Sequence, residues 1–70
     1  MDYLVIIEKT DHNYSAFLPD MPGCVATGAT TGEVLKNLKI ALALHLDGLK
    51  EDGLPIPEPA AQHSYVSTSV

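Results

Sequence analysis

The sequence predicts an α+β fold, in which a small antiparallel sheet of three to four strands packs on one helix. Short apolar segments separated by turn residues occupy roughly the first third of the chain, and one long stretch with helical periodicity follows them. The final residues, 65–70, are rich in strand-forming types and are a candidate fourth strand. The expected element order is therefore β-β-β-α-β.

Three short segments read as strands. Asp2–Lys9 is apolar on both faces near its middle, which predicts a central position in the sheet. Residues 10–13 form a polar turn, and Tyr14–Leu18 is the second strand of the resulting hairpin. Cys24–Thr27 is the third strand, and Gly28 ends it.

A proline corner separates the second and third strands. Pro19 and Pro22 stop the second strand because proline lacks the backbone donor that a ladder needs. Asp20 can accept hydrogen bonds from nearby amides, and Gly23 can supply an unusual dihedral. Two interpretations stay open: the corner is a device that turns the chain, or it presents residues to a partner.

One helix should follow the third strand. Thr30 and Glu33 have the spacing of a capping box, which predicts a helix start at this point. The helix should run to about Asp52, because Gly53 is a typical C-terminal stop and Pro55 forbids continuation.

The helix carries apolar residues on two sides. The main stripe should pack on the sheet and consists of Leu35, Leu38, Leu42, Leu46 and Leu49, widened by Val34, Ala41 and His45. Ile40 and Leu44 lie four residues apart on the opposite side. We expect these two residues to form an oligomer interface, although single exposed apolar residues are also common on monomers.

Size and charge narrow the function. The 70 residues make a single domain, 1–70, which is marginally stable alone and would gain from self-association. The net charge is −5, with four lysines and no arginine, so direct nucleic-acid binding is not expected. An acidic chain suits a basic protein partner, although acidity also simply promotes solubility.

The sequence gives no sign of export or membrane insertion. No apolar run approaches the ~20 residues that span a bilayer, and the start at Met1-Asp2 lacks a basic signal region. The lone Cys24 cannot form an internal disulfide and is expected to be a small buried residue. We therefore expect a cytoplasmic protein.

No pattern of residues predicts catalysis, a metal or a cofactor. His12, His45 and His63 lack the spacing of zinc ligands. The acids tested as a two-metal nuclease site lie on different predicted elements; they are Glu8, Asp11, Asp20 and Glu33. We expect a protein that is not an enzyme, and a residual metal-dependent nuclease is the weakest alternative.

An ordered set of residues resembles the HicB family of bacterial antitoxins. The set comprises Tyr14, Ala16, Leu18-Pro19-Asp20, Pro22-Gly23-Cys24, Gly28, Thr30, Glu33, Gly53, Ile56-Pro57 and Pro59. The resemblance implies a β-β-β-α-β domain similar to a trimmed RNase H fold without its catalytic acids. Many HicB proteins continue into a DNA-binding domain; this chain shows no such domain before Val70, so operator binding is not expected.

The resemblance also implies a partner. HicB-like domains bind a small basic HicA toxin, which cleaves mRNA, and cover its active site; they commonly form dimers or larger homo-oligomers. The residues we expect at the partner surface are exposed acids and a residue of the proline corner: Asp11, Asp20, Glu51 and Asp52. The alternative is a stand-alone oligomeric HicB-like domain that has no toxin.

Overall fold

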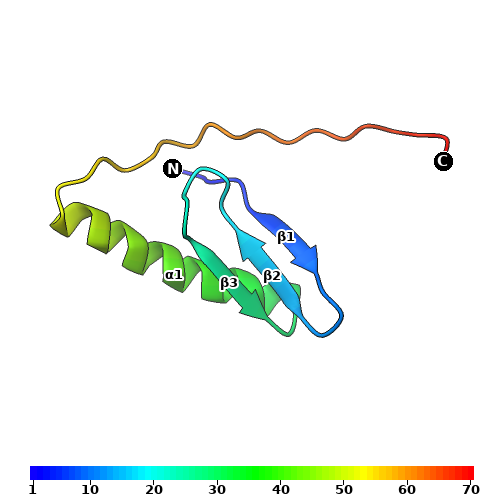
Figure 1. Cartoon of the computed structure of the whole chain (residues 1–70), viewed down its shortest axis with the longest axis horizontal. Coiled ribbons are helices and arrows are strands. Elements are labelled where there is room, and N and C mark those ends of the chain that lie inside the picture. The colour runs from blue at the N-terminus through cyan, green and yellow to red at the C-terminus, as the bar shows by residue number, and fades with distance from the viewer.

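The computed structural model describes residues 1–70 and contains three strands followed by one helix (Figure 1). The elements are β1 (Ile6–Lys9), β2 (Tyr14–Phe17), β3 (Val25–Gly28) and α1 (Thr31–Glu51). The predicted α+β class and the order of these four elements are confirmed. The residues after the helical turn are extended and pair with no strand, so the expected fourth strand is not formed.

The sheet is antiparallel, with strand order β1-β2-β3. The central strand is β2, so the prediction that the first strand is central was wrong. Apolar residues occur on both faces of β1 for a different reason. The side chains on one face of β1 point toward the side of the sheet where α1 lies. Those on the other face belong to the opposite side of the sheet, which no helix or strand covers.

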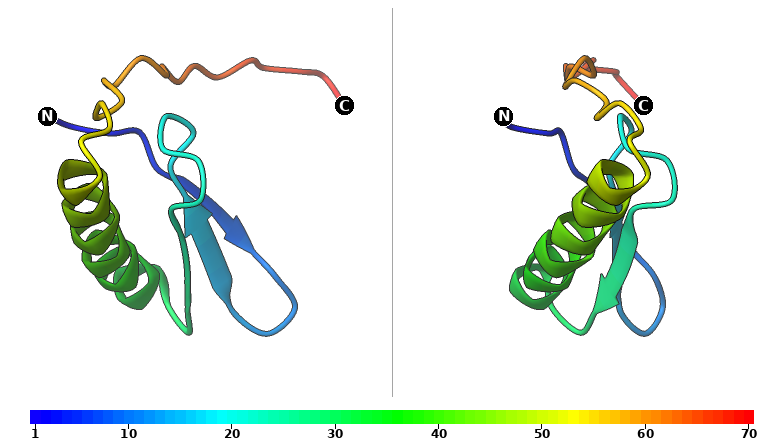
Figure 2. Two further views of the ribbon diagram at one scale, coloured as in Figure 1. Left: turned by 60° about the vertical axis from the view of Figure 1, so that its left-hand side comes forward. Right: turned by 90° about the vertical axis from the view of Figure 1, so that its left-hand side faces the viewer.

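The molecule has two layers, because α1 covers only one face of the sheet (Figure 2). The helix packs on β3 and β2 and leaves the β1 side less covered. Six residues form the buried core: Ala16, Leu18, Met21, Cys24, Val34 and Leu38. No helix combines the length and the apolarity that crossing a membrane requires.

Both ends of α1 follow from the local sequence. The Thr30 side chain accepts a hydrogen bond of 3.1 Å from the amide of Glu33, which confirms the predicted N-cap. At the other end Gly53 takes φ +67°, and the amide of Leu54 donates to the carbonyl of Leu49 at 2.9 Å. The amide of Gly53 also donates to Lys50, and the two bonds together make a Schellman motif.

The predicted apolar stripe is largely confirmed, with one difference. Val34 and Leu38 are buried, while Leu42, Leu46 and Leu49 are half-buried against the core. Leu35 instead keeps 42% of its surface exposed. The difference arises because α1 lies over β2 and β3, so a residue on its β1 side has less sheet beneath it.

Candidate functional site

The proline corner is a folded loop whose centre belongs to the core. The amide of Leu18 donates to Cys24, which extends the pairing of β2 with β3 into the base of the loop. Two further backbone bonds of 3.1 Å join Met21 to Leu18 and to Cys24, and Gly23 adopts φ +85°. Met21 is only 1% exposed. The corner therefore turns the chain, as one interpretation expected, and it also supplies a core residue that the sequence did not indicate.

Asp20 in this loop holds the C-terminal segment. Its carboxylate accepts hydrogen bonds from the amides of Ala60 and Ala61 at 3.0–3.2 Å. The hydroxyl of Tyr3 donates to the carbonyl of Pro57 a few residues earlier. The proline-rich segment is thus fastened at two points, and the Asp20 carboxylate is engaged within the molecule. A part for Asp20 in a partner surface stays a prediction.

The four acids predicted at a partner surface do not form one patch. Asp11 is exposed in the turn between β1 and β2, whereas Asp20 follows β2 at the opposite end of the sheet. Glu51 and Asp52 are exposed at the C-terminal end of α1, far from the β1–β2 turn (Figure 1). A flat partner surface could therefore contact either Asp11 or the pair Glu51 and Asp52, but not all three.

The sheet face that α1 leaves uncovered carries an apolar row across all three strands. Ile6 pairs with Phe17, and Phe17 pairs with Val25, so the three side chains lie side by side on one face. Ala16, the neighbour of Phe17, is buried on the helix side, which places this row on the opposite side. Val25 is 64% exposed, and Ile6 and Phe17 are half-buried.

The same face carries a carboxylate and no positive charge. Next to the apolar row lies a polar row, in which Glu8 pairs with Ser15 and Ser15 pairs with Thr27. Strand alternation directs Lys9 to the helix side, and the other three lysines belong to α1, which forms the second layer. We call this surface the open face and define it by Ile6, Glu8, Ser15, Phe17, Val25 and Thr27.

The outer side of the helix carries a second, smaller apolar surface. Ile40 is 54% exposed and Leu44 is 68% exposed, so both point away from the core as the sequence predicted. Their role in oligomer formation stays a prediction.

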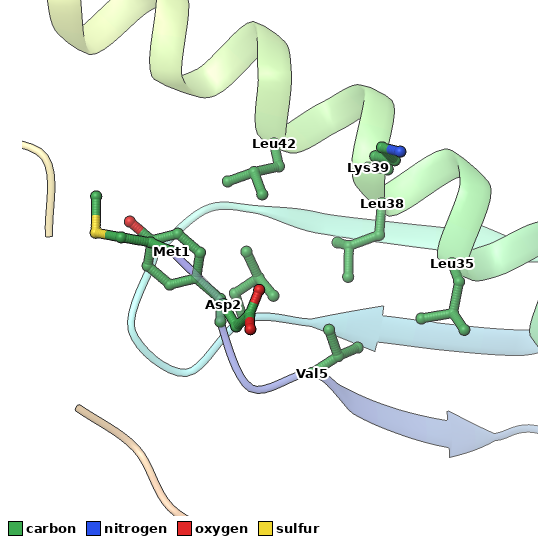
Figure 3. A pocket seen from close by; sticks show the side chains of 9 residues that line it. Met1, Asp2, Val5, Leu35, Leu38, Lys39 and Leu42 are labelled. Atoms are coloured by element: carbon green, nitrogen blue, oxygen red, sulfur yellow. The ribbon is translucent and has the colours of Figure 1, made fainter. Parts of the chain in front are cut away.

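An apolar groove runs between α1 and the N-terminal segment (Figure 3). It encloses about 500 Å³, and Leu35, Leu38 and Leu42 line it from the helix while Tyr3 and Val5 line it from the other side. Asp2 and Lys39 are the charged residues among its lining. The groove therefore lacks the converging polar groups that a catalytic or cofactor site needs.

The remaining reactive side chains do not converge. Cys24 is buried, and burial raises the pKa of its thiol above the ordinary value of 9.0, which makes it a poor nucleophile. No group of three His, Cys, Asp or Glu side chains comes close enough to hold a metal ion. Glu33 lies in the first turn of α1, and Glu8 lies on the open face of the sheet.

Comparisons with known proteins converge on one family. Residues 3–69 match the family described as the HicB-like antitoxin of bacterial toxin–antitoxin systems. A chain from a solved HicA3 and HicB3 toxin–antitoxin complex superposes with a TM-score of 0.72 and 33% identity, covering 86% of this chain and 70% of that one.

Several curated proteins are similar in sequence. An uncharacterised 14.9 kDa protein of Haemophilus phage HP1 is 34% identical over 67 residues, which are 96% of this chain and 50% of the phage protein. A UPF0150 protein of Helicobacter pylori is 43% identical over 70% of this chain and 68% of its own length. A UPF0150 protein of Thermoplasma acidophilum is 36% identical over 89% of this chain and 91% of its own length. The chain thus spans half the length of the phage relative and nearly all of the archaeal one.

Proposed function

Because the chain belongs to the HicB-like antitoxin family, we propose that it neutralises a small basic HicA-type toxin by covering the active site with which the toxin cleaves mRNA. The similarity to a chain of a HicA3 and HicB3 complex supports this kind of partner. Such a toxin acts on mRNA, so the proposal also places the protein in the cytoplasm. The role needs no catalysis by this chain.

The observation that carries the proposal is the composition of the open face. An exposed apolar row supplies surface that a partner would bury, and central apolar anchors dominate the affinity of most interfaces. The adjoining Glu8 and the absence of lysine on this face match a basic partner, which a net charge of −5 would also attract at long range. This chain, bound to the toxin through the open face, would exclude RNA from the toxin by its bulk and by its negative charge.

The exposed acids supplement this surface. Asp11 lies just beyond the Glu8 end of β1, so it is the predicted acid best placed to extend the open face. Glu51 and Asp52 lie at the other end of the molecule, where they would meet a toxin only if it wraps around the helix C-terminus.

The test uses the HicA-type protein encoded in the same genome and two matched charge substitutions. Val25→Lys places a cation at the exposed end of the apolar row. Leu44→Lys makes the same change at a similarly exposed position on the helix. We expect Val25→Lys to weaken toxin binding about tenfold or more in calorimetry, and Leu44→Lys to change it little. Equal affinity of both variants and the unaltered chain would refute the open face as the toxin site.

A second candidate function is a stand-alone oligomeric HicB-like domain without a toxin. The exposure of Ile40 and Leu44 on the outer side of α1 favours it, because copies of the chain could pair through these residues. Ile40→Asp would then lower the mass of the assembly in light scattering while circular dichroism stays unchanged. An unchanged mass would argue against this interface.

A further inference from the structure

The outer edge of β1 has no partner strand. β2 pairs with one side of β1, and no strand pairs with the other side, so β1 is an edge strand. The edge is also apolar, since Ile7 is 39% exposed and Ile6 is half-buried. An open, apolar edge offers unpaired backbone groups to any extended chain, and proteins usually cover such edges.

The C-terminal residues are of strand-forming types but pair with no sheet. They could therefore supply the strand that the β1 edge lacks. Tyr65, Val66 and Val70 are almost fully exposed, and the segment that contains them is extended. In an extended chain Val66, Thr68 and Val70 share one face, and all three are β-branched. Residues of this kind gain most when they pack on a neighbouring strand.

The segment does not follow the edge of its own subunit. It leaves the anchor at Ala61 and passes beside β1, where His63–Tyr65 and Leu4–Ile7 line a cavity of about 410 Å³. From there it diverges from the sheet: β1 leads down to the β1–β2 turn, whereas the segment ends at the upper right of the view, away from that turn (Figure 1). Only Glu8 and Lys9 of β1 remain beyond Ile7, whereas the segment has five more residues after Tyr65.

We propose that residues 65–70 add a strand to the outer β1 edge of a second copy of this chain, and that the second copy returns its own segment in the same way. Reciprocal exchange gives a closed two-fold dimer, in which each open edge is covered by the partner. Six extended residues span about 20 Å, which suffices to cover β1 and the residues just before it.

The exchange explains why the anchor lies where it does. Asp20 and Tyr3 fix the chain at Ala61 and Pro57, so the six terminal residues are projected away from the subunit rather than folded onto it. The exchange uses the sheet edge and leaves the open face free. It therefore stands independently of the proposed toxin site.

The first test compares the full chain with a chain that ends at Ser64. Light scattering should give the full chain a mass of at least twice 7.5 kDa, and removal of residues 65–70 should halve the mass of the assembly. Ser67→Ala and Ser69→Ala are the controls, because they change exposed residues without removing the backbone donors and should leave the mass unchanged. A truncated chain that keeps the full mass would overturn the proposal and point to the helix surface instead.

A second test separates exchange from pairing within one chain. A tagged chain with Glu8→Cys is mixed with an untagged chain carrying Thr68→Cys, and a short bismaleimide is added after the subunits have exchanged. Exchange predicts a cross-linked product that contains one chain of each kind, while either variant alone should give little. A monomeric full chain whose residues 65–70 show slowed amide exchange would overturn the proposal, since the segment would then pair with its own β1.

Discussion

The carboxylate of Asp20 accepts hydrogen bonds from the backbone amide of Ala61, 41 positions further along the chain. The bond joins the proline corner between β2 and β3 to the segment that follows the helix. It explains what the corner does besides turning the chain: the loop presents a carboxylate to two consecutive amides. Because these amides have no partner in a sheet, this contact and that of Tyr3 decide where the C-terminal segment runs.

Replacement of Asp20 should release the C-terminal segment. Asp20→Asn removes the negative charge and puts an amide donor where an acceptor was, so at least one bond to Ala60 or Ala61 is lost. We expect a loss of about 1–2 kcal/mol in the free energy of unfolding, with faster hydrogen exchange at both amides. Asp11→Asn is the matched control, because Asp11 is exposed in a turn. Equal effects of the two substitutions would contradict the anchoring role.

Gly28 and Gly48 should respond oppositely to alanine. A Cβ at Gly28 would lie 2.6 Å from the backbone nitrogen of Val34, so Gly28→Ala must push the first turn of α1 off β3. A Cβ at Gly48 would meet nothing within 4 Å, and alanine is the better helix former by about 1 kcal/mol. Urea unfolding should therefore show strong destabilisation for Gly28→Ala and modest stabilisation for Gly48→Ala. Similar midpoints for both variants would be incompatible with this packing.

The N-cap should contribute measurably to stability. Thr30→Ala removes the acceptor for the Glu33 amide and should cost about 1 kcal/mol. Thr31→Ala, at the exposed first position of the helix, is the control and should change the unfolding midpoint by much less. Equal losses of stability for the two substitutions would show that the Thr30 side chain does not cap the helix.

Burial of Cys24 predicts a loss of stability at alkaline pH. Burial raises the pKa of the thiol, so above pH 9 the unfolded chain releases this proton while the folded chain keeps it. The unfolded state then binds fewer protons, and the free energy of unfolding falls as pH rises through this range. Between pH 8 and 10.5, the melting temperature of the natural chain should fall more steeply with pH than that of Cys24→Ala. Equal dependence of the melting temperature on pH in the two proteins would show that the thiol does not contribute to the loss of stability.

Local signals account for most of the fold that the sequence predicted. The Thr30 cap, the Gly53 stop and the leucine spacing are properties of neighbouring residues, so they predicted α1 to within about one residue at each end. Strand order was not accessible in the same way, because an apolar residue such as Ile6 looks alike on a central strand and on an uncovered sheet face. Met21 was missed for a related reason, since only the folded corner brings it into the core.

The candidate site was predictable only in part. Exposure of Ile40 and Leu44 followed from helical spacing, and the structure bears it out. The row of Ile6, Phe17 and Val25 requires the register of two strand pairs, which a single sequence does not define. The contact of Asp20 with Ala61 spans the whole helix, so no local pattern could have shown that this carboxylate is already engaged.

The central claim, neutralisation of a HicA-type toxin through the open face, is tested most directly by growth rescue. The HicA-type protein from the same genome is expressed in a bacterial host, alone or with this chain, and colony formation and mRNA integrity are measured. We expect growth arrest by the toxin alone and full rescue by the natural chain or by Leu44→Lys. Val25→Lys should fail to rescue growth although that variant is folded and present in equal amount. Persistent arrest with the natural chain, or equal rescue by both variants, would contradict this claim.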